Sequence, residues 1–262
     1  MAFLLSTEEL LPVIVPLTLY WVASGMYSIA MGSKKHRLFT PEEEEAKNLV
    51  TRRQVLVVVL INQAMQIVLA VLTISGKGGD GGQHDKAGPA LLPSLLRYPW
   101  QLTVGVLIMD AWGYFWHRLS HENRFLYKHV HSLHHRLVVP YAYGSQYQHP
   151  IDSFMADGVG SVLATLATGM SPRTATVFLA LLTLKGVDDH CGLWLPGSPT
   201  SRLCNNGAMH AVHHQHHGIK SNYSVYFLVT WDKLFGTYMP YSVEEREGGG
   251  YQLRSGTTTK DL

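Results

Sequence analysis

Cysteine and charge are both scarce in this chain. Only two of the 262 residues are cysteine, Cys191 and Cys204, and no CxxC pair occurs, which excludes a disulfide scaffold and a zinc ribbon. Charged residues make up 15% of the chain, against about 25% in ordinary soluble domains. The net charge is only +2, so the basic excess of a nucleic-acid-binding protein is missing. Hydrophobic residues at 46% argue against a disordered chain.

Histidine is present in excess. The chain has 15 histidines, of which 13 lie between His117 and His217. Imidazole is the commonest metal ligand in proteins. A hydrophobic chain that is rich in histidine and poor in cysteine therefore indicates a metal site.

Long uncharged runs predict membrane helices. Residues 11–31 and 55–75 contain no charged residue, and a spanning helix needs about 20 mostly apolar residues. The alternative is that both runs are buried helices in the core of a soluble protein, but both exceed the length typical of such helices. The first run is preceded by Glu8 and Glu9 and by no basic residue, unlike a cleavable signal peptide.

Two further apolar regions extend this pattern. The run from Trp100 to Trp116 has aromatic residues at its ends, as at a membrane interface. The region 154–184 is interrupted by Ser171-Pro172-Arg173, so we expect a helical hairpin there. Together these regions predict an all-α, multi-pass membrane bundle of about four membrane helices.

Basic residues predict the orientation of this bundle. Loop 32–54 carries six lysines and arginines, and loop 76–98 carries three. Because basic loops stay on the cytosolic side, the first loop is expected in the cytosol and the second in the lumen. The third helix then brings the clustered histidines to the cytosolic side, where cysteines stay reduced. The polar tail 244–262 is expected to be disordered.

The clustered histidines form boxes with the spacing of metal ligands. An HxxxH is followed by two HxxHH boxes and a solitary His190. Residues three or four apart are neighbours on a helix, so each HxxHH can present its imidazoles to one side. The candidate ligands are His117, His121, His131, His134, His135, His190, His210, His213 and His214.

Four further residues are candidates for supporting roles. Asp188 and Asp189 precede His190, and carboxylates often orient ligating imidazoles; the alternative is that they cap a helix end. Asp110 lies seven residues before His117 on the same helix face, and either serves the site or pairs within the bundle. His149 is a candidate for an extra ligand. His216 and His217, behind the last box, are weaker ones.

The ligand set narrows the choice of metal. Imidazoles alone suit zinc, copper, iron and nickel. A zinc hydrolase usually shows HExxH, but His121-Glu122 lacks the second histidine, and a bis-histidine haem needs only two ligands. Eight to ten imidazoles fit two metal ions. Two irons beside an apolar membrane pocket suggest O2 activation and attack on a lipid C–H bond.

The boxes, in this order, resemble those of the membrane fatty acid hydroxylase/sterol desaturase superfamily. Four stretches between and around them are similar to plant sphinganine C4-hydroxylases: residues 125–150 (FLYKHVHSLHHRLVVPYAYGSQYQHP), 169–174 (GMSPRT), 187–197 (VDDHCGLWLPG) and 231–241 (WDKLFGTYMPY). Wax-pathway very-long-chain aldehyde decarbonylases and C4-methylsterol oxidases share the boxes. This sequence departs from the pattern at His216-His217, where a bulkier pair without histidine is expected.

The resemblance implies a di-iron, O2-dependent enzyme of the endoplasmic reticulum membrane. The eight box histidines would be the iron ligands, His190 an additional one, and the histidine-rich part a cytosolic cap. Electrons would come from NAD(P)H through cytochrome b5 or a reductase. The other implied partners are a long-chain lipid and a homo- or hetero-oligomer.

The resemblance also implies domain boundaries and a ranking of the candidate reactions. Residues 1–97 would hold the N-terminal membrane helices, 98–245 the catalytic domain and 246–262 the polar tail. The favoured reaction is C4-hydroxylation of a sphingoid long-chain base, and the alternative is conversion of aldehydes to alkanes. Sterol oxidation and a non-catalytic scaffold role are further alternatives.

Overall fold

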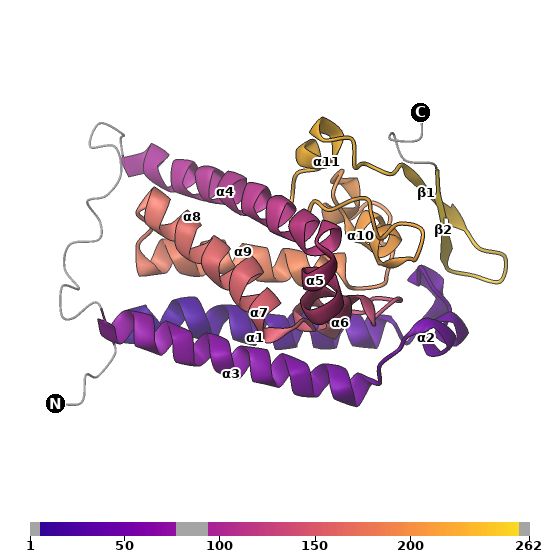
Figure 1. The fold of residues 1–262 in the computed structure, drawn as a ribbon, viewed down its shortest axis with the longest axis horizontal. Coiled ribbons are helices and arrows are strands. Elements are labelled where there is room, and N and C mark those ends of the chain that lie inside the picture. Colours follow the sequence, from indigo (N-terminus) through magenta and orange to yellow (C-terminus); the bar gives the residue numbers. More distant parts are fainter. Residues whose placement is uncertain (1–5, 77–93, 257–262) are drawn as a thin grey trace.

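A computed structural model describes residues 6–76 and 94–256. Long helices lie side by side along its longest axis (Figure 1). They are α1 (Thr7–Ala30), α3 (Arg52–Gly76), α4 (Ser94–Glu122) and α9 (Pro172–Asp189), together with a near-continuous series of α7 (Pro150–Ser153), the π-helix η5 (Phe154–Val159) and α8 (Gly160–Thr168). Most of loop 76–98, on which the predicted orientation partly depends, lies outside the described residues.

Helices α1 and α9 run parallel and are joined at both ends. Arg173 forms an ion pair with Glu8 where the two helices begin. At the opposite end, the Tyr27 hydroxyl donates to Asp188 Oδ1 at 2.5 Å. Helix α1 starts with a capping box of Ser6 and Glu9, which satisfies the first free N–H groups of the helix.

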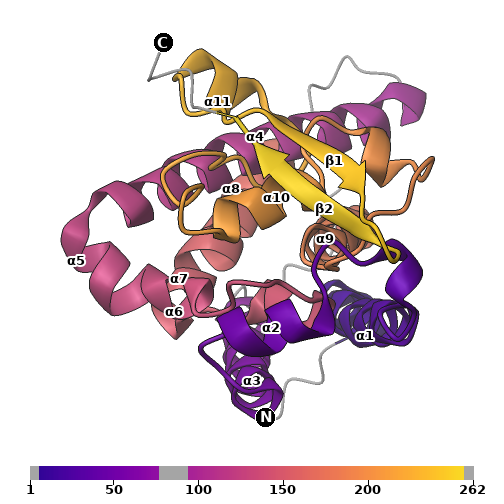
Figure 2. The same cartoon turned by 90° about the vertical axis from the view of Figure 1, so that its right-hand side faces the viewer.

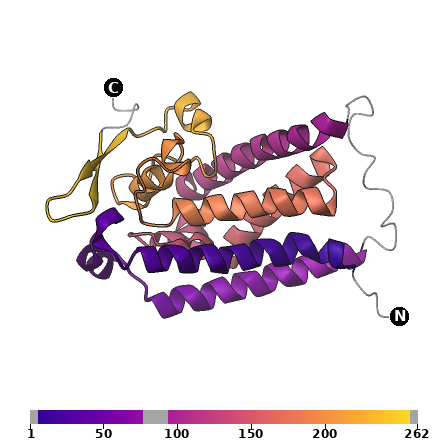
Figure 3. The ribbon, with the colours of Figure 1, turned by 180° about the vertical axis from the view of Figure 1, so that it is seen from behind.

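The outward faces of α1 and α3 are apolar. Large hydrophobic side chains are exposed along both helices, among them Ile14, Val22, Met26, Ile29, Val57, Leu60, Ile61 and Val68. Within the described residues two helices are long and apolar enough to cross a membrane, Thr7–Ala30 and Arg52–Leu72. Figure 3 shows these two helices next to each other on one side of the molecule. Such a continuous apolar face suits lipid better than water.

The third and fourth predicted apolar regions are also helical. α4 contains residues 100–116, and α8 and α9 form the expected hairpin, which turns at Gly169 in the left-handed region, with φ 61°. α8 packs closely on α4, since a Cβ at Gly160 would lie 2.6 Å from Trp112 Cδ1. A glycine permits this approach because it has no side chain.

Shorter elements cover one end of the long helices (Figure 2). They are η1 (Lys34–His36), α2 (Pro41–Lys47), α5 (Arg124–Leu126), the π-helix η3 (Tyr127–His131), α6 (Ser132–His135), η4 (Ala142–Gln146), η6 (Thr200–Arg202), α10 (Gly207–His214), α11 (Thr230–Leu234), β1 (Tyr241–Glu245) and β2 (Tyr251–Ser255). We call this end the histidine-bearing end, because it contains the histidine boxes.

The prediction that residues 244–262 are disordered is wrong for residues 244–255. β1 and β2 form an antiparallel hairpin in which Val243 pairs with Leu253. Both side chains pack against a core that includes Phe39 and Ala211, and Arg246 forms an ion pair with Glu43 at 3.0 Å. The polar composition concealed these apolar positions, and the small sheet also departs from a purely α fold.

Candidate metal centre

Nine histidines converge at the histidine-bearing end in two groups. Within each group, the potential ligand nitrogens all lie within 4.8 Å of one another. The five-histidine group consists of His117, His121, His131, His135 and His213. The four-histidine group consists of His134, His190, His210 and His214. The structure thus brings together all the histidines that the boxes and His190 predicted.

Each HxxHH box is divided between the two groups. His131 and His135 belong to one group, whereas His134, between them, belongs to the other. In the last box His210 and His214 pair, and His213 joins the opposite group. Each box therefore supplies ligands to both groups, an arrangement that a pair of metal ions can use. Residues i and i+4 point in nearly the same direction, whereas residue i+3 projects to the other side of that line.

Backbone carbonyls fix the ring orientation of most of these histidines. Five Nδ1 atoms contact a carbonyl oxygen at 2.7–2.9 Å: those of His117 with Tyr223, His134 with Tyr147, His190 with Gly186, His213 with Ser221 and His214 with Leu137. A carbonyl oxygen can only accept a hydrogen bond, so each of these Nδ1 atoms carries the proton. Each Nε2 is then left with a free lone pair.

Some of these Nε2 lone pairs point at one another, and at least one has no hydrogen-bond partner. The Nε2 atoms of His134 and His190 lie 3.4 Å apart, and neither carries a proton to place between them. His213 Nε2 is buried and has no hydrogen-bond partner. A metal ion beside these nitrogens would accept their lone pairs. The donor set therefore fits one metal ion in each group.

Burial favours the neutral form of several of these imidazoles. Loss of solvent contact is the main cause that lowers the pKa of His134 to about 4, and it lowers the pKa of His190 and His213 to about 3. Neighbouring imidazoles act in the same direction. At neutral pH these three rings are in the unprotonated form that binds metals.

One supporting residue was missed by sequence reasoning. Asp152 Oδ2 lies 2.7 Å from His131 Nδ1, and its Oδ1 accepts a hydrogen bond from Trp116 Nε1 at 2.8 Å. A carboxylate on the outer nitrogen is the typical support of a metal-binding histidine. No box or spacing in the sequence marks Asp152, because its partner is 21 residues away.

The predicted supporting carboxylates have other partners. Asp188 accepts hydrogen bonds from Tyr27 and Thr200, and Asp189 forms an ion pair with buried Lys185. Asp110 accepts from the backbone N–H groups of Phe227 and Leu228. Asp188 and Asp110 thus join elements of the fold, and Asp189 pairs within α9. In the part of the chain that the structure describes, no hydrogen bond links any of these three carboxylates to a ligand histidine. For Asp110, the geometry favours pairing within the bundle.

The additional histidine candidates lie outside both groups. His149 precedes α7 and its Nδ1 accepts from Ile151 N at 3.2 Å, so it caps that helix. His216 and His217 are exposed, and His217 contacts Ser255 of the terminal hairpin at 2.7 Å.

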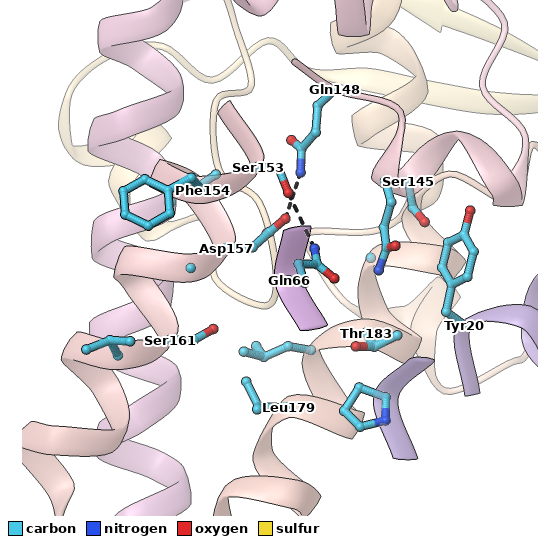
Figure 4. A pocket seen from close by; sticks show the side chains of 18 of the residues that line it. Tyr20, Gln66, Ser145, Gln148, Ser153, Phe154, Asp157, Ser161, Leu179 and Thr183 are labelled. Atoms are coloured by element: carbon cyan, nitrogen blue, oxygen red, sulfur yellow. Dashed lines mark hydrogen bonds between the residues drawn. The ribbon is translucent and has the colours of Figure 1, made fainter. Parts of the chain in front are cut away.

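A cavity of about 750 Å³ extends from the histidines along the helices. Five of the histidines line it: His117, His131, His134, His190 and His210. One stripe of α9 lines its length, from Pro172 through Ala175, Leu179, Leu182 and Gly186 to His190. Polar side chains interrupt the apolar wall, among them Gln66, Gln148 and Asp157 (Figure 4). The cavity can hold a long apolar molecule with one end at the metal groups.

Comparison with known proteins agrees with this site. Residues 102–237, which hold all nine histidines, match the fatty acid hydroxylase family. The chain belongs to this family. It is 45% identical to sphinganine C4-monooxygenase 1 of Arabidopsis thaliana over 97% of each chain. It is 41% identical to very-long-chain aldehyde decarbonylase GL1-9 of Oryza sativa subsp. indica over 95% of each chain.

A more distant relative has a similar name. Sphingolipid C4-hydroxylase sur2 of Schizosaccharomyces pombe is 36% identical over 86% of each chain. No solved structure matches this chain. The family and the histidine groups together make this protein an enzyme of the fatty acid hydroxylase superfamily.

Proposed function

We propose that this protein is a di-iron, O2-dependent oxidase that hydroxylates a sphingoid long-chain base at C4. The observation that carries the proposal is the opening of two buried histidine groups onto one end of a long, mostly apolar cavity. The names of the C4-hydroxylating relatives support the choice of substrate.

The nine histidines would hold two irons, one in each group. When bound, the irons supply the activation of O2 that an unactivated C–H bond requires. One oxygen atom enters the C–H bond as a hydroxyl, and the other leaves as water after the uptake of two electrons and two protons. The chain itself orients the lipid along α9 and keeps bulk water from the reacting carbon.

The length of the cavity suits a long-chain base. From Ala175 to His190 the lining stripe of α9 spans about 22 Å at 1.5 Å per residue. The tail beyond C4 of a C18 base is about 18 Å long, at roughly 1.3 Å per carbon. Such a tail can therefore lie along α9 while C4 is at the histidines.

We further propose that the chain is a multi-pass protein of the endoplasmic reticulum membrane with about four membrane helices. α1, α3, α4 and the α8–α9 hairpin would be embedded, and the histidine-bearing end would form a cytosolic cap. The six basic residues of loop 32–54, at the histidine-bearing end, support this orientation. In this arrangement the membrane anchor consists of residues 1–97 and the catalytic domain of residues 98–245. The tail consists of residues 246–262, and its strand β2 is folded against the cap.

The reaction needs an external source of two electrons. We propose that NAD(P)H supplies them through cytochrome b5 or a reductase that meets the cytosolic cap. A homo- or hetero-oligomer is compatible with the same arrangement.

Aldehyde decarbonylation is the second candidate. It is favoured by the 41% identity to an aldehyde decarbonylase over 95% of the chain. Sterol oxidation has less support. A non-catalytic scaffold role also has less support, because all nine ligand positions are histidines and they converge.

The chemical identity of the product distinguishes C4-hydroxylation from aldehyde decarbonylation. The protein is expressed in a host that lacks C4-hydroxylated bases and is supplied with labelled O2. We expect the label in a hydroxyl group on an unshortened base. An alkane one carbon shorter than the supplied aldehyde, without any hydroxylated base, would overturn the proposal.

A further inference from the structure

The carboxylate of Asp157 in the cavity wall has no cationic partner. Asp157 lies in the π-helix η5 and lines the cavity (Figure 4). It accepts hydrogen bonds from two neutral donors, Gln148 Nε2 at 2.6 Å and the Tyr226 hydroxyl at 3.2 Å. The ion pairs among the described residues do not include it. Among the described lining residues there is also no lysine or arginine.

The other acidic residues of the wall are already engaged. Asp152 supports His131 and accepts from Trp116. Glu9 belongs to the capping box at the far end of α1. Asp152 is thus committed to a ligand histidine and Glu9 to a helix cap at the far end, whereas the hydrogen bonds of Asp157 serve neither role. Its open acceptor positions can receive a cation from a bound molecule.

A carboxylate beside an apolar cavity selects for positive charge. Two neutral hydrogen bonds leave part of its four acceptor positions open, and removal from water makes an unpaired charge costly. A bound ammonium group would supply the missing partner through charge-assisted hydrogen bonds. A neutral aldehyde would leave the carboxylate unpaired.

Asp157 also follows closely on a residue that supports a ligand histidine. It lies five residues after Asp152, which contacts His131, and this is about one turn of the intervening π-helical segment. In a sphingoid base the ammonium is on C2 and the reacting carbon is C4, so the charged group and the reacting carbon can both lie in this part of the cavity.

We propose that Asp157 binds the 2-ammonium group of a long-chain base and is a specificity-determining residue of the cavity. Gln148 and Tyr226 hold its carboxylate in place. The inference rests on the proposed function, and it adds a reason why this chain would take a cationic base instead of an aldehyde: the aldehyde offers no partner for the charge.

The test compares charged and neutral forms of one substrate. Purified wild-type protein and the Asp157→Asn variant are given sphinganine and N-acetylsphinganine, whose nitrogen is neutral. Asparagine keeps the size of the side chain and can still accept from Gln148. We expect KM for sphinganine to rise at least about 10-fold, as loss of a charge-assisted hydrogen bond implies. KM for the N-acetyl form and the iron content should not change.

Two control variants make the result specific, and a third variant serves as a replacement. Glu45→Gln removes one exposed carboxylate from α2, far from the cavity wall, and should leave KM for sphinganine unchanged. Asp157→Glu retains the charge and should recover part of the lost affinity. If Asp157→Asn loses iron, Tyr226→Phe replaces it as the test variant. That variant removes one hydrogen bond from the carboxylate and should raise KM for sphinganine by a smaller factor.

Direct binding separates this inference from the proposed reaction. Labelled sphinganine is titrated into each purified protein in detergent, without electron donor. Tighter binding of sphinganine than of the N-acetyl form, lost in Asp157→Asn, supports the inference even if no hydroxylated product forms. Equal binding of sphinganine by the wild type and Asp157→Asn overturns it, even if the wild type hydroxylates the base.

Discussion

Asp152 and His131 form the only carboxylate–imidazole pair among the nine ligand candidates in the described chain, with Oδ2 2.7 Å from Nδ1. Trp116 of α4 holds the other oxygen of Asp152 at 2.8 Å. The orientation of His131 therefore depends on contacts from both α4 and α7. His131 Nε2 in turn faces His135 Nε2 at 3.2 Å, inside the five-histidine group.

Removal of the Asp152 carboxylate should weaken this group specifically. In Asp152→Ala we expect iron affinity at the five-histidine group to fall about 10- to 100-fold, the usual cost of losing such support. Iron titration of the metal-free protein measures it, with Glu45→Ala as the control for loss of a carboxylate. Unchanged affinity at both groups would contradict the assigned role of Asp152.

Two irons should bind, and each can be removed separately. His213→Ala truncates the five-histidine group and His134→Ala the four-histidine group. We expect each variant to lose activity and to lose mainly the iron of its own group, while the protein still inserts into the membrane. Metal analysis of purified protein measures the content.

The controls for this experiment are histidines that lie outside both groups. His149→Ala and His217→Ala should retain both irons, because the first residue caps a helix and the second contacts Ser255. One metal or none in the active wild type would refute the di-iron assignment.

How far the sequence could predict this site depends on distance along the chain. The boxes reveal eight ligand candidates because histidines three or four residues apart are visible locally, and the solitary His190 is added by the family resemblance. The division of His134 from its neighbours required the positions of α6 and α10 in space. Asp152 and Asp157 gave no signal, since they contact residues that are distant in the sequence: Asp152 contacts Trp116, 36 residues away, and Asp157 contacts Tyr226, 69 residues away. The apolar runs predicted the long helices, whereas the hairpin at Val243 and Leu253 was hidden in a polar segment.

The metal-free protein should lose stability in mild acid. Burial lowers the pKa of His134 to about 4 and the pKa of His190 to about 3, below about 6.5 in the unfolded chain. Between these values the unfolded chain binds protons that the folded chain does not. The free energy of unfolding therefore falls as the pH falls from about 6.5 towards 4. The Tm of metal-free protein in detergent should drop between about pH 7 and pH 5, and a constant Tm would contradict this.

The proposed orientation can be tested with glycosylation tags. A tag after Leu262 should stay unmodified, because the cap is proposed to face the cytosol. A tag before Met1 should be modified in the lumen. The reverse pattern would show that the six basic residues of loop 32–54 do not set the orientation.

A larger side chain at the far end of the cavity should shorten the lipid that the enzyme accepts. Ala175 lines the cavity near the start of α9, about 22 Å from His190 along the helix. Leucine at this position adds three carbons to space that the end of a long tail would occupy. Ala175→Leu should therefore lower kcat/KM for a C18 base more than for bases with shorter tails.

Val177→Leu is the matched control, because Val177 lies on the same helix and is 51% exposed on its outer side. Relative kcat/KM values for a series of bases, measured with equal iron content, check the prediction. An equal loss for all tail lengths would mean that Ala175 affects packing and not the tail. A loss confined to long tails would place the reacting carbon at the histidines and the tail along α9.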